Sequence, residues 1–146
     1  MRTVHHIEAP VETVFEFFKD PRLSADLAVG GVSEDVLEMK VTDEGTGTYY
    51  GWRARLGGLR MPVEGFEVLT DVVPNKHITE KSSSAMVGTW DYDFEPEGTG
   101  TKVTMEHHSR SLWGLPPLRT LTDLVQSRMT ESFMQKARVR LETSSA

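Results

Sequence analysis

Residues 88–94 read GTWDYDF, a stretch in which aromatic side chains alternate with small or acidic ones. Successive side chains of an extended strand point to opposite faces, so Trp90, Tyr92 and Phe94 share one face and the polar residues share the other. This alternation is typical of an antiparallel strand that is buried on one face and solvated on the other. The sequence therefore predicts a β-sheet with an aromatic inner face.

Neighbouring segments repeat this alternation. The next segment places Val103 and Met105 on one face, and residues 48–56 place Tyr50 and Trp52 together. Short breaks rich in Gly, Pro and Ser separate the segments, as hairpin connections require. These segments are predicted to be further strands of the same sheet.

Residues 63–72 have apolar side chains on both faces. Phe66, Val68 and Val72 share one face, which we expect to be the inner one, while Leu69 lies on the other. A mixed pattern of this kind indicates either a partly covered outer surface or a β-bulge.

Helices are predicted at both ends of the sheet-forming region. A strand over residues 2–8 precedes Ala9-Pro10, where proline suits the first turn of a helix. Asp20-Pro21 ends this helix, because the residue before a proline avoids the α conformation. After Pro116-Pro117, about 25 residues contain neither Gly nor Pro and carry apolar residues at steps of three and four. This apolar stripe consists of Leu118, Leu121, Val125, Met129, Phe133, Ala137 and Leu141. We expect residues 143–146 to fray.

The order of elements predicts one α+β domain over residues 1–146: a strand, one or two short helices, six strands and a long helix. A sheet with one apolar face must be covered, and the C-terminal helix is the only predicted element long enough. Aromatic side chains along a curved sheet leave irregular gaps, so we expect an internal, largely apolar cavity between sheet and helix. The alternative is that these aromatic residues simply fill the core.

Composition argues against several classes of function. The 146 residues include 16 Lys and Arg against 22 Asp and Glu, and the formal charge of −6 is opposite in sign to that of a nucleic-acid-binding surface. No segment approaches the roughly 20 apolar residues of a membrane span, and no secretory signal is visible, so we expect a cytoplasmic protein. The absence of Cys excludes disulfides and thiolate metal sites. No motif indicates a cofactor or a metal ion.

An ordered set of short motifs resembles the SRPBCC or START-like superfamily. The chain carries Ile7-x-Ala9-Pro10, then Val14-Phe15 and Asp20-Pro21, and later Trp90-x-Tyr92-x-Phe94. The resemblance implies the helix-grip fold, in which a curved seven-stranded antiparallel sheet surrounds the long C-terminal helix above a ligand cavity. The superfamily includes polyketide cyclase/dehydrase-like proteins, lipid-transfer domains and accessory subunits, so the resemblance implies no single activity.

Two histidine pairs lie on the first and last predicted strands, which the resemblance makes antiparallel neighbours. Alternation places His5 and His107 on the inner face and His6 and His108 on the outer face. An inward imidazole is a candidate general acid or base, because its ordinary pKa of about 6.5 lies near working pH. Adjacent histidines in a strand cannot bind a common ion, which leaves a weak surface metal site at His108 with Glu106. The alternative is that all four are ordinary sheet histidines.

Glu64 and Glu80 are the candidate buried carboxyl groups. Glu64 alternates with Phe66 and Glu80 with Ile78, so each has an apolar neighbour on its own face. Burial of a carboxyl group raises its pKa and allows it to transfer protons near neutral pH. Glu64 follows the Gly57-Gly58 turn closely, where exposure to solvent is an equal alternative. We therefore assign the candidate catalytic roles to His107 and Glu80.

The predicted function is binding of a small hydrophobic or aromatic molecule, of polyketide, lipid or isoprenoid type, in the cavity. The predicted ligand-binding residues are His5, Tyr50, Trp52, Phe66, Trp90, Tyr92, Phe94, Met105, Val125 and Met129. One alternative is a polyketide cyclase/dehydrase-type enzyme with His107 or Glu80 as general base and a Tyr hydroxyl that stabilises an oxyanion. Another is an accessory protein or homodimer that associates through Trp113 or an outer apolar face. The sequence does not identify the ligand, the oligomeric state, or whether His5 and His107 meet.

Overall fold

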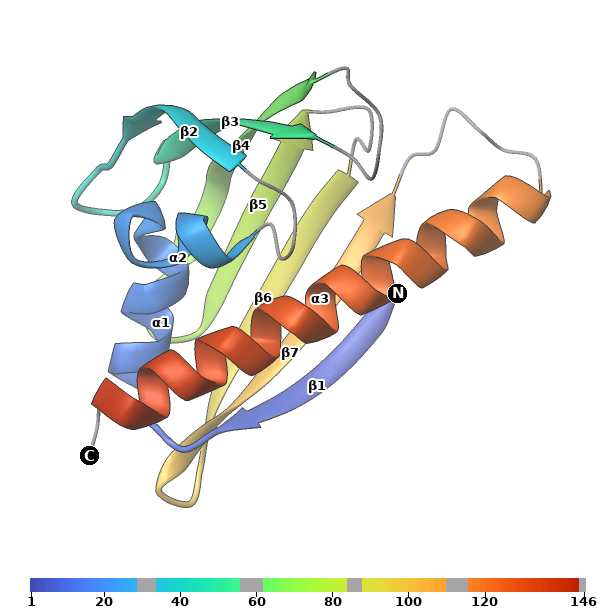
Figure 1. Ribbon diagram of the computed structural model, residues 1–146. Helices are drawn as coiled ribbons and strands as arrows, with labels where there is room; N and C mark the ends of the chain where they lie inside the picture. Colours follow the sequence, from blue (N-terminus) through green and yellow to red (C-terminus); the bar gives the residue numbers. More distant parts are fainter. Residues whose placement is uncertain (29–33, 56–61, 84–87, 110–115, 145–146) are drawn as a thin grey trace.

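The computed structural model describes residues 1–28, 34–55, 62–83, 88–109 and 116–144, and Figure 1 shows how its elements are arranged. In these residues the elements follow in the order β1 (Arg2–Ile7), α1 (Val11–Lys19), α2 (Pro21–Ala28), β2 (Glu34–Lys40), β3 (Tyr49–Arg55), β4 (Pro62–Val73), β5 (His77–Ser83), β6 (Gly88–Glu97), β7 (Gly100–Ser109) and α3 (Pro116–Ser144). The predicted α+β class and the order of elements are confirmed.

The seven described strands form one antiparallel sheet in the order β1-β7-β6-β5-β4-β3-β2. Consecutive strands from β2 to β7 pair as hairpin neighbours, and β1 pairs with β7 at the far edge. Because β1 and β7 are neighbours, the beginning of the chain lies beside the strand that leads to α3 (Figure 1). This is the seven-stranded helix-grip arrangement that the resemblance implies.

A β-bulge in β4 corrects our prediction for Phe66. The register of β4 against β5 shifts between Leu69 and Asp71. Odd-numbered residues therefore face inward before the shift and even-numbered residues after it. Trp52 is buried and lies opposite Gly65, whereas Phe66 lies on the other face and is 50% exposed. Leu69, which we expected opposite Phe66, is the buried residue. Phe66 is therefore an outer-face residue and does not line the interior.

Helix α1 covers one end of the inner face. Pro10 occupies its N-cap position and Asp20 its C-cap position, as the two proline signals predict, and α2 begins directly at Pro21. The ring of Phe15 packs edge-on against Phe94 at 5.6 Å, and the ring of Phe18 lies 5.2 Å from that of Tyr92. These contacts make the α1 end of the interior a closely packed aromatic core.

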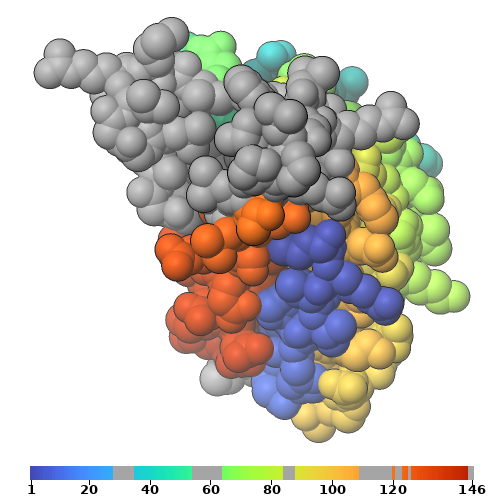
Figure 2. Space-filling view, turned by 90° about the vertical axis from the view of Figure 1, so that its right-hand side faces the viewer, coloured from blue at the N-terminus to red at the C-terminus, as the bar shows by residue number. Residues whose placement is uncertain are grey.

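Helix α3 crosses the sheet and packs beside β1, as Figures 1 and 2 both show. Its C-terminal half buries Met134, Ala137 and Leu141, each at most 4% exposed. Further toward the N-terminus the buried residues are polar, Gln126 at 5% and Thr130 at 4%. The predicted stripe is therefore correct in its second half, while in its first half Met129 is only half-buried. The side chains of Leu118, Leu121 and Val125 lie outside the described part of the chain.

The C-terminal end of α3 extends further than expected. Helical structure continues through Ser144, whereas the sequence predicts fraying from residue 143. The hydroxyl of Thr143 donates to the carbonyl of Val139 at 2.6 Å, and that of Ser144 donates to the carbonyl of Arg140 at 2.8 Å. Each hydroxyl bonds back to the carbonyl four residues earlier, a common arrangement of Ser and Thr within a helix. None of the helices in the described residues has the length and apolar character that a bilayer span requires.

Candidate functional site

Antiparallel pairing places inner-face side chains in rows that run across the strands. In one row Leu69, Glu80, Trp90 and His107 lie directly opposite one another on β4, β5, β6 and β7. Adjacent strands are about 4.8 Å apart, so the Cα atoms of Glu80 and His107 are separated by roughly 10 Å. The structure thus brings the two predicted catalytic residues onto one face, with the indole of Trp90 between them.

Glu80 is a carboxyl group held in the interior by Tyr92. The Tyr92 hydroxyl donates a hydrogen bond to Glu80 Oε2 at 3.0 Å. Burial raises the pKa of Glu80 to about 8, the negative charge of Glu67 adds to this shift, and the Tyr92 hydrogen bond opposes it. Burial and the neighbouring Glu80 also raise the pKa of Tyr92 well above its ordinary value. At neutral pH Glu80 is therefore mainly the neutral acid, close to the point at which it exchanges its proton.

Glu67 is a second interior carboxyl group, which the sequence analysis did not identify. It lies opposite Tyr50 on β3 and Ser82 on β5. Its Oε1 accepts hydrogen bonds from Ser82 Oγ at 2.9 Å and from Trp52 Nε1 at 3.2 Å. Burial nevertheless raises the pKa of Glu67 to about 7, because the two hydrogen bonds only partly offset the loss of solvation.

Glu67 and Glu80 are diagonal neighbours on adjacent strands, since Glu67 pairs with Ser82 and Glu80 with Leu69. This spacing of about 7–8 Å lets each carboxylate disfavour ionisation of the other. Aromatic residues surround both groups. We refer to Tyr50, Trp52, Glu67, Glu80, Trp90 and Tyr92 as the acid–aromatic cluster.

His107 extends this cluster on the β7 side. It is 4% exposed, and its ring centroid lies 4.1 Å from that of Trp90. Burial lowers the pKa of His107 to about 4, the N-terminal amino group lowers it further, and a hydrogen bond with Gln126 of α3 opposes the shift. The imidazole is therefore neutral at neutral pH and is a much weaker base than an ordinary histidine.

Gly88 provides the space that the His107 ring occupies. A Cβ atom at this position would collide with His107 Nε2 and lie 3.2 Å from the carbonyl oxygen of His108. Gly88 pairs with Ser109 on β7, two residues along from the Trp90–His107 pair. The absence of a side chain at Gly88 thus leaves room for the imidazole beside Trp90.

His5 lies on the inner face but does not meet His107. The register places His5 opposite Val103. His107 instead lies opposite the beginning of the chain, and the backbone N–H of His107 donates to the Met1 carbonyl at 2.8 Å. The two histidines are therefore offset by four residues, or about 13 Å along the sheet. Burial lowers the pKa of His5, and nearby Glu131 on α3 opposes this shift.

Four buried side-chain atoms on the inner face have no hydrogen-bond partner among the described residues. They are Thr3 Oγ1, His5 Nε2, Glu67 Oε2 and His107 Nε2. Buried polar atoms in folded proteins are normally satisfied, so each exception calls for an explanation such as a bound molecule or water. All four belong to β1, β4 or β7 and lie on the face that α1 and α3 cover.

The remaining sequence candidates lie elsewhere. Glu64 is on the outer face, where it accepts a hydrogen bond from Arg53 Nε at 2.7 Å. His6 is also on the outer face, bonded to Glu8 and Glu97. His108 Nε2 is 3.6 Å from Glu106, and the described residues contain no group of three side chains suited to a metal ion. Residues 110–115, which include Trp113, lie outside the described part of the chain.

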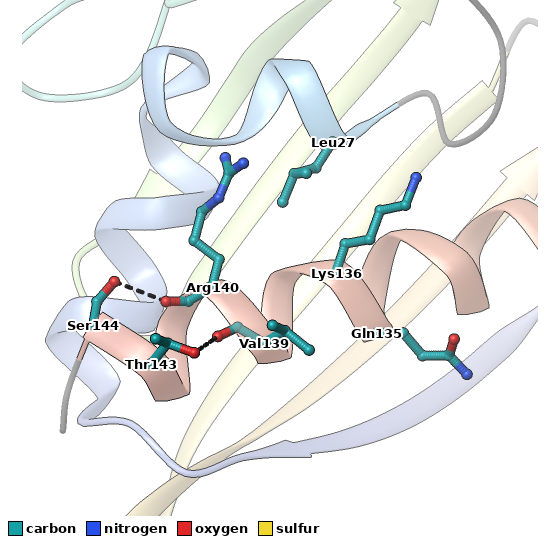
Figure 3. Close-up of a pocket in the computed structure, with 7 residues that line it drawn as sticks. All are labelled: Leu27, Gln135, Lys136, Val139, Arg140, Thr143 and Ser144. Carbon is teal, nitrogen blue, oxygen red and sulfur yellow. Dashed lines mark hydrogen bonds between the residues drawn. The ribbon is translucent and has the colours of Figure 1, made fainter.

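A separate hollow of about 560 Å³ lies on the surface between α2 and the last turns of α3 (Figure 3). Leu27 and Val139 contribute its apolar lining, and Arg140 is held by Asp26 through hydrogen bonds of 2.8 and 2.9 Å. Its Thr143 and Ser144 hydroxyls are bonded to carbonyls of α3 (Figure 3). This surface hollow is distinct from the interior, and the Arg140 guanidinium and both hydroxyls in its lining already have partners.

Several interior polar residues escaped the sequence analysis: Glu67, Ser82, Gln126 and Thr130. Glu67 follows Phe66, and reading Phe66 as inward placed Glu67 outward. Gly65 is the residue that could have indicated this. It lies opposite Trp52 and leaves room for the indole, which suggests that Gly65, and with it Glu67, is on the inner face of β4. Gln126 and Thr130 occur at a helical spacing of four, yet polar residues at that spacing are normally solvated.

Comparisons with known proteins agree with this architecture. The family model described as "Polyketide cyclase / dehydrase and lipid transport" matches residues 1–145. The structure is similar to that of TTHA0849 from Thermus thermophilus, with TM-score 0.76 and 24% identity over 100% of this chain and 99% of that one. It is also similar to Ms6760 from Mycobacterium smegmatis, with TM-score 0.74 and 17% identity over 98% and 90% of the two chains. At these identities the likeness concerns the fold. No curated protein matches the chain.

Proposed function

The chain belongs to the polyketide cyclase/dehydrase and lipid transport family, and from this premise we propose that it binds a small hydrophobic or aromatic molecule between the inner face of the sheet and α3. The ligand would be of polyketide, lipid or isoprenoid type. The observation that carries the proposal is the set of four buried polar atoms without partners among the described residues, Thr3 Oγ1, His5 Nε2, Glu67 Oε2 and His107 Nε2. Binding sites for small molecules combine apolar walls with a few polar groups that fix the orientation of the ligand.

The two ends of the interior differ in a way that supports this proposal. Toward α1 the aromatic rings of Phe15, Phe18 and Phe94 pack against one another. In the rows that contain Glu67 and Glu80, aromatic side chains instead alternate with polar ones, and the helix residue near His107 is the buried Gln126. We assign the ligand to this second region, with Trp52, Trp90, Tyr92, Met105 and Met129 as apolar contacts.

A thermal-shift panel tests the proposal. Neutral aromatic polyketide-like phenols, a long-chain alcohol and an isoprenoid alcohol are each added to the protein at increasing concentration. A ligand present at 100 times its Kd adds about 2.7 kcal/mol to stability and so raises the melting temperature. We expect at least one class to produce a saturable rise, and a panel without any rise contradicts the proposal.

A matched pair of variants locates the site. Trp90→Ala removes an inner aromatic side chain and should reduce the affinity for the active compound about tenfold or more. Phe66→Ala removes an outer aromatic side chain that is 50% exposed and should leave the affinity unchanged. An equal loss of affinity in the two variants would mean that the ligand does not bind at the inner face beside Trp90.

Glu80 and Tyr92 favour a second candidate function, a cyclase/dehydrase-type reaction. An acid with a pKa of about 8 exchanges protons efficiently near neutral pH. The Tyr92 hydroxyl donates to Glu80 at 3.0 Å, and it would donate to a developing oxyanion by turning away from that carboxyl group. With a pKa of about 4, His107 is the weaker candidate base. With a poly-β-ketone substrate, Glu80→Gln should lower turnover about a hundredfold or more. Unchanged turnover in a folded Glu80→Gln protein excludes this role.

A further inference from the structure

The acid–aromatic cluster contains two acids and no described base. The hydrogen-bond partners of Glu67 are Ser82 and Trp52, and that of Glu80 is Tyr92, so every described partner is a neutral group. Several described Lys and Arg side chains pair with acids elsewhere: Arg53 with Glu64, Lys102 with Glu95 and Arg140 with Asp26. Among the described residues, no positive side chain forms an ion pair with either carboxyl group.

Two neighbouring interior carboxyl groups without a counter-ion are costly to ionise. Desolvation and mutual repulsion both favour the protonated forms of Glu67 and Glu80. A bound cation would offset both effects, whereas an anionic ligand would be repelled and a neutral ligand would leave the carboxyls protonated. The unpartnered Glu67 Oε2 is an acceptor that an N–H donor from such a cation would satisfy.

The aromatic members of the cluster add a second attraction for a cation. The indole of Trp90 stacks near Tyr92, with ring centroids 6.4 Å apart, and lies directly opposite Glu80. The faces of Trp and Tyr rings attract positive charge, and the effect grows when water is excluded. The net charge of −6 also favours the approach of a positive ligand over that of a negative one.

We infer that the ligand of the interior site carries a basic amine, whose ammonium group binds between Glu67 and Glu80 while its apolar body contacts Trp52, Trp90 and Tyr92. This inference rests on the proposed binding function and specifies its ligand class. An amine that enters as a cation stabilises the ionised carboxyl groups, so binding releases protons from the cluster.

Isothermal titration calorimetry with two matched probes tests the inference. The probes are 2-phenylethylamine and 2-phenylethanol, which differ in an ammonium or hydroxyl group on the same apolar body. At pH 7 we expect the amine to bind at least tenfold more tightly than the alcohol. Titration of the amine in two buffers of different ionisation enthalpy should show release of protons into solution, and titration of the alcohol should not.

Conservative variants test whether the preference for the amine over the alcohol arises from the acid–aromatic cluster. Glu67→Gln and Glu80→Gln should each weaken amine binding about tenfold or more and change alcohol binding much less, so that the preference for the amine shrinks. The outer-face variant Glu64→Gln should bind both probes as the parent does. A matching circular dichroism spectrum and melting curve confirm that each variant is folded.

The outcomes separate this inference from the proposed function. Alcohol that binds as tightly as the amine, or an amine preference that survives in both Gln variants, overturns the inference and leaves the proposed function in place. Binding of neither probe also overturns the inference, and the neutral panel described above then decides the proposed function on its own.

Discussion

The interior holds titratable groups whose pKa values move in opposite directions. Burial raises the pKa of Glu80 to about 8 and that of Glu67 to about 7, and it lowers the pKa of His107 to about 4. The common cause is that a low-polarity environment disfavours whichever form of a group is charged. At neutral pH Glu80 and His107 are therefore mainly neutral, and Glu67 is near the midpoint of its titration.

These shifts predict how stability depends on pH. From the ordinary glutamate value of 4.5 up to about 8, the folded protein holds more protons on Glu67 and Glu80 than the unfolded chain, so their contribution to stability falls as pH rises. His107 acts oppositely between about 4 and 6.5, where the unfolded chain holds more protons. Above pH 6.5, of these three residues, mainly Glu67 and Glu80 make the stability depend on pH.

The melting temperature should accordingly fall between pH 6.5 and about 8.5 in the parent protein. This fall should be much smaller in the double variant Glu67→Gln/Glu80→Gln, whose amides do not titrate. Glu64→Gln makes the same chemical change on the outer face and should behave as the parent. Parallel melting profiles for the parent and the double variant would show that neither carboxyl group has a raised pKa.

Gly88 permits the close approach of His107, and its substitution tests that contact. Gly88→Ala should reduce the free energy of unfolding by about 1–3 kcal/mol, because the new methyl group meets the buried imidazole. Gly51→Ala is the control within a strand, since the nearest atoms there are 3.9 Å from the position that the methyl group would occupy, and no strain is expected. Denaturant unfolding measures both.

A double-variant cycle assigns the Gly88 effect to the imidazole. In a His107→Ala background, Gly88→Ala should cost markedly less than in the parent, because the colliding ring is absent. An equal cost in both backgrounds would mean that the strain arises from the sheet backbone.

Strand β6 and strand β4 show what periodicity can and cannot predict. The alternation in β6 is unbroken, so Trp90, Tyr92 and Phe94 are on the inner face as expected. In β4 the bulge between Leu69 and Asp71 changes the phase, and a pattern that assumes one phase throughout placed Phe66 inside and overlooked Glu67. The mixed pattern of this segment indicated a bulge as one of two alternatives, but the position of the bulge depends on pairing with β5, which the segment alone does not encode.

Helix α3 buries apolar side chains in its C-terminal half, and the buried side chains described further toward its N-terminus, Gln126 and Thr130, are polar. Met134 is 2% exposed and belongs to the core, whereas Val139 is 66% exposed on the same helix. Met134→Ala should destabilise the protein by about 2–5 kcal/mol. Val139→Ala should change its stability by no more than about 0.5 kcal/mol. Similar losses for the two variants in denaturant unfolding would contradict the packing of α3 described above.

The whole architecture was more predictable than the site within it. Proline positions, strand alternation and the uninterrupted C-terminal helix together predicted the α+β order and, with the family resemblance, the sheet that surrounds α3. The Glu67–Glu80 pair and the His107–Gln126 hydrogen bond depend on strand register and on the rotation of α3. These relations join residues distant in sequence, and periodicity within one element carries no information about them.

A small molecule that binds at the inner face beside Trp52 and Trp90 is the central proposal for this protein. The most direct test is a ¹H–¹⁵N NMR titration that follows the indole N–H resonances of these residues with the ligand that gives the largest thermal shift. We predict saturable shifts of both resonances with the same Kd as the thermal data. Saturation that leaves both indoles unchanged, or shifts only residues around Leu27 and Val139 in the surface hollow, would contradict the account.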